Sequence, residues 1–348
     1  MADTEALTSA DLKGALAGGL IRESVMNKIW DISKIPLPFT DLVGTDSVDV
    51  KNEYCEWTKD KLAAVDLTNA VGDGWDAVGN DAALGTRVGN HHQISDKVVK
   101  VSHRSDASTT IGRAKELGYQ LMRRQQELRR DVEGIALSNQ ESRADAGTDV
   151  DGEQGLAGCL PAWIETTVRN GTAGGFNTTT KIVDAATPGS AAALNETWVR
   201  EVIDSVYSQG GDPSVMMSVP GIIGNFAQYL FTSTAQVATL TSDQGRSREK
   251  AAALSAVNVF ITQHGTVRLV SNRLQQVYDN GGTDCADVFI LDPEYVALTY
   301  LEGYRTDALG KTGLSNKRQM SVDWSLVVHN EEAHGIIFGI DPTLDVAA

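Results

Sequence analysis

Cysteine and long apolar runs are scarce in this sequence. The three cysteines, Cys55, Cys159 and Cys285, lie far apart in 348 residues, and no two form a CxxC pair. This spacing supports neither a zinc knuckle nor a disulfide framework, and it fits synthesis in a reducing cytoplasm. No run approaches the roughly 18 apolar residues that span a bilayer, and the N-terminus lacks the pattern of a secretory signal. We therefore expect a soluble protein that has no membrane partner.

Positive charge is also in short supply. The chain has 30 Lys and Arg against 46 Asp and Glu, for a formal net charge of −16. A protein that holds nucleic acid through its phosphates needs clustered Lys and Arg. Sequence-specific nucleic-acid binding is therefore disfavoured, whereas an acidic wall would let packed DNA slide past without sticking.

Motifs that carry catalysis are missing. The sequence has no HExxH and no Gly-x-Ser-x-Gly elbow, and the tripeptide GKT at 310–312 lacks the first glycine of a phosphate loop, because that position is Arg305. His91 and His92 would point to opposite faces of a strand, so we interpret them as a surface pair. We predict that the protein is not an enzyme and needs no metal or cofactor.

The first 40 residues are predicted to form an N-terminal arm. The stretch IPLPF at 35–39 forces an extended path, because proline disfavours helix at its own position and just before it. Apolar residues on such a strip usually bind a surface. Leu37 and Phe39 are therefore candidates for anchoring the arm, on the protein's own body or on a neighbour.

Residues 41–105 are predicted to form an extended loop built as a long β-hairpin. The segments 48–57 and 97–102 favour strands, and the stretch between them is rich in Gly, Asp and Asn. An isolated two-stranded ribbon is marginal in water, so this hairpin must lie against another surface. The candidates for contact with a neighbouring subunit are Tyr54, Glu56, Trp57 and Trp75.

Residues 106–190 are predicted to form a peripheral domain with a long spine helix at 108–140. Its apolar residues recur at steps of three, four or seven on one helical face, and a strand is expected at 161–168. Arg123 and Arg130 lie opposite the apolar face. They would touch DNA if that face met it, but ion pairing within one copy of the chain or between copies is favoured by the −16 charge.

Residues 191–315 are predicted to form an axial α/β domain with an uncertain boundary, and residues 316–348 to return to the peripheral sheet. Asn195 begins a helix that Gly210 ends, a buried strand follows at 215–219, and Pro220 begins a second helix. Strands are expected at 266–270 and 288–291, and a short helix from 293 to 300. Clean alternation over 319–329 predicts a half-buried antiparallel strand.

Several stretches together resemble a family of tailed-phage major head proteins. The resemblance runs in one order from about residue 35 to 340. The matching stretches are EWTKDKLA (56–63), RVGNHHQI (87–94), GRAKELGYQL (112–121), LSNQ (137–140), GTVR (265–268), LDPEY (291–295), RTD (305–307), KTG (311–313), KRQ (317–319) and NEEAHG (330–335). The order of arm, hairpin, spine helix and α/β lobe is also that of the Hong Kong 97-type capsid fold, an α+β fold.

This resemblance implies a major capsid protein that is made in the host bacterial cytoplasm and ends in the virion. Copies would form hexamers and pentamers that close into an icosahedral head around double-stranded DNA. Portal and scaffolding proteins are expected partners, and a decoration protein is a further candidate. Some relatives of the fold join subunits by a Lys–Asn bond, but no motif here assigns that role to Lys59, Lys61, Asn330 or Glu331.

Three alternatives remain open from the sequence. An encapsulin-type compartment shell would share the fold and hold a cargo enzyme in place of DNA. A metal- or sugar-dependent hydrolase would reveal itself by metal content and a pH–rate profile. A small adhesive or decoration protein would not need the spine helix.

Overall fold

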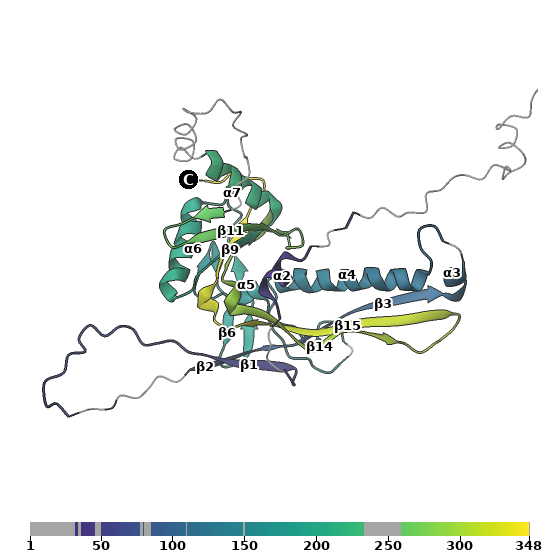
Figure 1. The fold of residues 1–348 in the computed structure, drawn as a ribbon, viewed down its shortest axis with the longest axis horizontal. Coiled ribbons are helices and arrows are strands. Elements are labelled where there is room, and N and C mark those ends of the chain that lie inside the picture. Colours follow the sequence, from purple (N-terminus) through teal and green to yellow (C-terminus); the bar gives the residue numbers. More distant parts are fainter. Residues whose placement is uncertain are drawn as a thin grey trace, which may run out of the picture.

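The computed structural model describes most of the chain. The described residues are 32–33, 36–45, 50–76, 79, 85–108, 110–148, 150–232 and 259–347. Most of the predicted N-terminal arm therefore lies outside the described residues. The remainder forms two lobes, with a long loop projecting from the end of one of them (Figure 1).

The first lobe is built on a seven-stranded sheet. Its strand order is β10-β11-β9-β13-β16-β4, and β12 adds to β13. The strands are β4 (Val168–Arg169), β9 (Val215–Ser218), β10 (Val259–Ile261), β11 (Thr266–Ser271), β12 (Tyr278–Asp279), β13 (Asp284–Leu291) and β16 (Gly335–Ile340). Every residue of β16 is buried, so this late segment of the chain lies at the centre of the lobe.

Helices α6 (Glu196–Gln209) and α7 (Pro220–Thr232) pack on this sheet through one apolar cluster. The Asn195 side chain accepts a hydrogen bond from the backbone N–H of Thr197, and Gly210 takes a left-handed conformation with φ 106° at the other end of α6. The predicted helix–strand–helix order is confirmed, as are the strands expected at 266–270 and 288–291.

The second lobe is a three-stranded antiparallel sheet that carries the spine helix. Its strands are β14 (Val296–Ala308), β15 (Ser315–Val328) and β3 (Gln93–Ser102), in the order β14-β15-β3. The predicted strand is confirmed, but its alternation holds only from residue 319 to 324, because all residues from 324 to 328 are buried. Helix α4 (Glu116–Ala136) runs along the sheet, with Leu128 and Val132 facing inward (Figure 1).

The predicted hairpin exists, but with a different return strand. Strand β1 (Tyr54–Lys59) pairs with β2 (Thr86–His91) in antiparallel register, with Lys59 opposite Thr86. Residues 97–102 belong to β3 and pair with β15, so their prediction as the return strand was wrong. Both segments have strand propensity, and only the pairing with β15, more than 200 residues away, separates them.

Three further predictions need correction. The helix expected at 108–140 is shorter, because α4 spans only Glu116–Ala136, and the separate helix α3 (His103–Ala107) ends before residue 108. The strand expected at 161–168 is instead the short helix α5 (Leu160–Trp163) followed by β4. The helix expected from 293 to 300 is one 3₁₀ turn, η1 (Pro293–Tyr295), which leads directly into β14.

The prediction that His91 and His92 form a surface pair is also wrong. His91 is half-buried and His92 is buried, with its Nδ1 atom 3.3 Å from Oδ1 of Asp323.

The remaining described elements are short. They are α2 (Pro38–Val43), the pairs β5–β8 (Gly171–Thr172, Thr187–Pro188) and β6–β7 (Gly175–Asn177, Ile182–Asp184), and η2 (Glu331–Ala333).

Candidate subunit-contact site

The extended loop is left uncovered by the rest of the described subunit. Every residue from 60 to 76 is exposed, and the loop projects from the end of the β1–β2 hairpin (Figure 1). It carries five large apolar side chains that are 72–95% exposed, namely Leu62, Val65, Leu67, Val71 and Trp75. Monomeric proteins rarely expose so much apolar surface in one place, and such surfaces mark contact sites.

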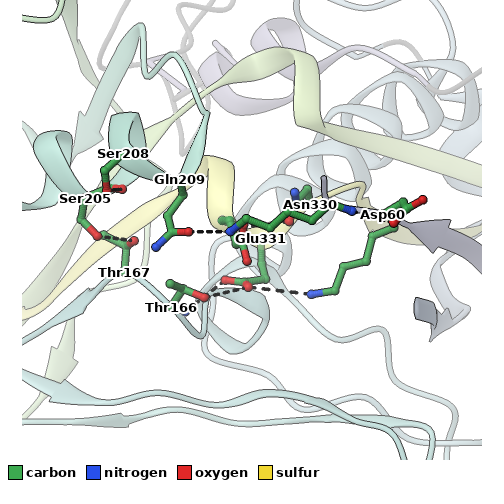
Figure 2. A network of polar contacts seen from close by, with 11 residues as sticks. Asp60, Thr166, Thr167, Ser205, Ser208, Gln209, Asn330 and Glu331 are labelled. Atoms are coloured by element: carbon green, nitrogen blue, oxygen red, sulfur yellow. Dashed lines mark hydrogen bonds and ion pairs between the residues drawn. The ribbon is translucent and has the colours of Figure 1, made fainter. Parts of the chain in front are cut away.

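A network of polar contacts fixes the base of this loop to the body (Figure 2). The ammonium group of Lys61 donates to Gln209 at 2.7 Å and pairs with Glu332 at 2.6 Å. Lys59 lies 3.8 Å from the Glu331 carboxylate. The loop therefore leaves the body in a direction set by ion pairs to η2 and a hydrogen bond to α6, although its own residues make no sheet.

Glu331 is the organising carboxylate of that network. It accepts hydrogen bonds from the backbone N–H of Thr166 at 3.0 Å and from the Thr166 hydroxyl at 2.9 Å. The adjacent Asn330 side chain accepts from the backbone N–H of Glu332. The structure thus brings Lys59, Lys61, Asn330 and Glu331 together within one subunit, where the two lysines form ion pairs.

The aromatic candidates at the hairpin divide into two groups. The Trp57 ring packs against Trp163 at a tilt of 37° with ring centroids 5.3 Å apart, and its indole N–H donates to the carbonyl of Val328 at 3.0 Å. Tyr54 donates to the carbonyl of Lys181 at 3.0 Å. Both contacts lie within the subunit and hold the hairpin on the body. Trp75 is 72% exposed, so it alone of the three aromatic candidates is fully available to a neighbour.

Glu56, the fourth hairpin candidate, is exposed and forms an ion pair with Arg87 on the paired strand. Opposite charges across an antiparallel pair stabilise it modestly. This pairing accounts for Glu56 within the hairpin, and its contact with a neighbour remains a prediction.

The arm candidates meet a buried carboxylate that the sequence did not reveal. Phe39 is 0% exposed and lies in α2. Glu133 of the spine helix is also fully buried, and it accepts from the backbone N–H groups of Phe39 at 2.8 Å and Thr40 at 2.7 Å. The Asn272 side chain donates to the same carboxylate at 2.7 Å. Leu37, half-buried, precedes α2 as its N-cap residue.

Glu133 thus joins three segments: the end of the arm, the spine helix and the chain after β11. A buried carboxylate is tolerated here because several hydrogen-bond donors satisfy its oxygens. The sequence held one signal for this role: Glu133 directly follows Val132, one of the apolar residues that recur on the buried face of the helix. A charged residue at a core position indicates a buried polar partner.

The two arginine candidates have different surroundings. Arg123 lies over the Tyr119 ring, 6.0 Å from its centroid. Arg130 lines a surface hollow with Asp131 and Gly134, and its Nε atom is buried without a hydrogen-bond partner within the described ranges. Within the subunit, Arg130 therefore has no ion pair among the described residues, and its pairing with a neighbouring subunit remains a prediction.

Nothing in the described part of the chain resembles a metal centre, since no three His, Cys, Asp or Glu side chains converge there. Burial raises the pKa of the Cys159 thiol and lowers the pKa of His334 to about 4. A buried thiol and a neutral, buried imidazole are poor nucleophiles and proton carriers, and both fit a packing role. No helix among the described residues has the length and apolar character needed to cross a membrane.

Comparison with known proteins decides the family. The family model described as SU10 major capsid protein matches residues 4–341. This chain belongs to that family. The major capsid protein of Escherichia phage Phieco32 is 35% identical over 133 residues, which are 38% of this chain and 36% of the relative. The SU10-type chain thus aligns with about a third of that relative's length.

Solved structures show the same fold for this SU10-family chain. A chain of Gordonia phage Cozz superposes with a TM-score of 0.59 at 13% identity, covering 100% of this chain and 98% of the other. The prediction of an α+β, Hong Kong 97-type capsid fold is confirmed. The protein is a phage major capsid protein and is located in the capsid of the virion.

The encapsulin alternative shares this architecture. The holo-SrpI encapsulin complex from Synechococcus elongatus PCC 7942 superposes with a TM-score of 0.53 at 12% identity, covering 99% of each chain. Likeness at this identity reports the fold alone. The match to the capsid family over nearly the whole chain favours the phage capsid.

Proposed function

We propose that copies of this chain assemble as hexamers and pentamers into an icosahedral head that encloses double-stranded DNA. One observation carries the proposal: the loop at 60–76 exposes apolar side chains that its own subunit does not cover. Covering them on neighbours would supply the burial that stabilises large obligate assemblies.

The two lobes are proposed to occupy different positions in each capsomer. The lobe of α6, α7 and the seven-stranded sheet would be the axial domain, around the capsomer centre. The lobe of α4 and the three-stranded sheet would be the peripheral domain, with the hairpin and loop as its extension. On sheet membership, β14 would belong to the peripheral domain and β16 to the axial domain, which shifts the boundaries expected at 315 and 316.

Partners and location follow from this proposal. Assembly would take place in the host bacterial cytoplasm, which is supported by three free, buried cysteines that need no oxidising compartment. Portal and scaffolding proteins would join the shell, with a decoration protein as a further partner. The DNA would be held without sequence recognition, in keeping with a net charge of −16. The subunit would perform no catalytic step.

Deletion of residues 66–85 tests the proposal. Six loop residues would remain to join Lys59 to Thr86, which already face each other across the hairpin. We expect folded subunits or small oligomers in place of closed shells, measured by sedimentation velocity and negative-stain electron microscopy. Circular dichroism and thermal unfolding check that the two lobes stay folded.

A matched pair of variants sharpens this test. Leu67→Ser with Val71→Ser removes two exposed apolar side chains, whereas Asn69→Ser with Ala70→Ser changes the same loop without removing them. We expect only the first pair to reduce shell yield. Normal closed shells from both the deletion and the Leu67/Val71 variant would contradict the proposal. Nucleic acid inside wild-type shells, measured by absorbance ratio, separates a phage head from an enzyme compartment.

A further inference from the structure

A buried carboxylate in the first lobe has no cationic partner. Asp287, in β13, is 5% exposed, yet no Lys, Arg or His side chain pairs with it within the described ranges. Its Oδ1 atom accepts hydrogen bonds from the Tyr278 hydroxyl at 2.6 Å and from the backbone N–H of Gly339 at 3.1 Å. Burying a carboxylate is unfavourable unless a cation or enough donors satisfy it, so two donors leave Asp287 under-compensated.

Two other buried carboxylates are more fully compensated. Glu133 accepts four hydrogen bonds, two at each oxygen, and Glu331 accepts three and lies 3.8 Å from the Lys59 ammonium group. At Asp287 both donors reach the same oxygen, and the described residues supply no hydrogen bond to Oδ2. An ionised carboxylate offers about four acceptor positions, so Asp287 can accept further donors.

The pairing of β13 with β16 is irregular at this residue. Residues 286 and 288 of β13 pair with residues 340 and 337 of β16, so Asp287 faces two residues, Phe338 and Gly339. Gly339 has a φ of 65°, a conformation that favours glycine, and its N–H points to the carboxylate. Bulges of this kind re-aim side chains and are common beside binding sites. The backbone is therefore shaped around the Asp287 carboxylate.

The carboxylate borders a hollow where the end of the spine helix meets the first lobe. The hollow has a volume of about 400 Å³ and is lined by the LSNQ stretch at 137–140, Pro188, Gln276, Tyr278 and Asp287. Asp287 is the single charged residue of this lining, and the others offer amide, hydroxyl and apolar groups. The LSNQ stretch has no part in the proposed contacts between subunits.

A second acceptor beside Asp287 also lacks a donor. The Gln275 side chain donates to the Asp287 carbonyl at 2.6 Å, and its own Oε1 atom is buried without a hydrogen-bond partner in the described part of the chain. Acceptors in want of donors therefore gather around Asp287. This polarity selects a ligand that carries donors and positive charge.

We propose that the hollow binds a small, diffusible organic cation, a primary ammonium group on a short aliphatic chain, with the ammonium on Asp287. An ammonium group supplies three donors and the missing charge. Leu137 and Pro188 provide apolar surface for the chain. A divalent metal ion fits less well, because no three His, Cys, Asp or Glu side chains converge among the described residues. The ligand would tie the end of α4 to the first lobe.

The pH dependence of binding distinguishes this hollow from surface carboxylates. Burial raises the pKa of Asp287 to about 6, so the carboxyl group is ionised at pH 7.5 and mostly protonated at pH 5. Burial also raises the pKa values of its titratable neighbours Tyr278 and Cys285, and Asp284 and Asp341 lie near Cys285. An ammonium ligand prefers the ionised form of Asp287, so its affinity should fall about tenfold between pH 7.5 and 5.

Calorimetric titration of the unassembled full-length subunit with 1,4-diaminobutane, at physiological salt, tests the proposal. We expect saturable binding at pH 7.5 and a raised unfolding temperature. Asp287→Asn should weaken binding about tenfold or more, because its amide oxygen can still accept from Tyr278 and Gly339 but carries no charge. Asp284→Asn, exposed on the same strand, is the matched control and should bind as the wild type does.

A second pair of variants separates loss of the ligand from loss of the fold. Ser138→Leu keeps the carboxylate and fills the hollow, whereas Ser138→Ala leaves the hollow open, so only the first should abolish binding. Thermal unfolding checks that both are folded. The neutral counterpart of the probe, 1,4-butanediol, should not bind.

Three results would overturn the proposal while leaving the proposed function intact. The first is diamine binding to Asp287→Asn and Ser138→Leu that is as tight as binding to the wild type, which would assign it to surface carboxylates. The second is equal binding of the diamine and the diol. The third is no saturable binding to the folded wild type, which would leave the hollow to water.

Discussion

The seven-stranded sheet and the extended loop differ in whether their own subunit buries their apolar side chains. All six residues of β16 and seven of the eight in β13 are buried, whereas every residue from 60 to 76 is exposed. Both regions contain large apolar side chains. The sheet closes its apolar surface within the subunit, and the loop leaves its surface to be closed by assembly. Changes in the first region should therefore alter folding, and changes in the second should alter assembly.

The largest effect is expected in the buried core. Trp324 is 0% exposed at the centre of the sheet that carries the spine helix. Trp324→Ala removes the ring and leaves a cavity, which should lower the free energy of unfolding by about 3–5 kcal/mol. Chemical denaturation of the unassembled subunit measures it, with Val98→Ala on the exposed face of β3 as the control. If Trp324→Ala lowered the free energy of unfolding by less than about 1 kcal/mol, the expected contrast between the buried core and the exposed loop would be contradicted.

Acid titration should reveal two opposing groups in the first lobe, each worth about 3 kcal/mol. Burial raises the pKa of Asp287 to about 6, so its protonation in the folded state adds stability as pH falls from about 6 towards 4. Burial lowers the pKa of His334 to about 4, so stability is lost as pH falls from about 6.5 to 4.

The two contributions nearly cancel in the wild type, and single variants separate them. Asp287→Asn should leave the His334 effect, so its unfolding free energy should fall more steeply than that of the wild type between pH 6.5 and 4. The comparison is the slope of stability against pH from denaturation curves. Parallel slopes for both proteins would show that Asp287 is not protonated in this window.

A smaller loss of stability is expected at the junction of the arm. Glu133→Ala leaves the backbone N–H groups of Phe39 and Thr40 and the Asn272 amide without their shared acceptor. An unsatisfied buried group costs about 1–3 kcal/mol. Unfolding free energy should fall by about 2–3 kcal/mol, and limited proteolysis should cut near residue 36. Glu127→Ala on the same helix should change neither.

The smallest effect on the subunit itself is expected in the loop. Trp75→Ala should change its unfolding free energy by less than about 0.5 kcal/mol, because the side chain is 72% exposed. Shell yield in the same preparation should nevertheless fall. Trp57→Ala is the contrasting variant. Because Trp57 packs against Trp163 within the subunit, this substitution should destabilise the hairpin.

The first lobe and the alternating strand β15 were predictable because their signals are local. The Asn195 cap, Gly210 and the period-two pattern of β15 each act within a few residues. The return strand of the hairpin was missed because 86–91 and 97–102 both favour strands, and only pairing with β15 decides between them. Of the candidate site, the exposed Trp75 was foreseen, but Glu133 and the unpaired state of Arg130 depend on neighbours that sequence spacing does not reveal.

The position of β16 has a consequence for synthesis on the ribosome. This strand is contributed by residues 335–340 and lies between β13 and β4. A nascent or prematurely terminated polypeptide that stops short of residue 335 cannot complete the sheet, whatever the state of its loop. We therefore expect that only polypeptides translated through β16 complete the seven-stranded sheet and can join a growing particle, so that truncated chains are excluded from the shell.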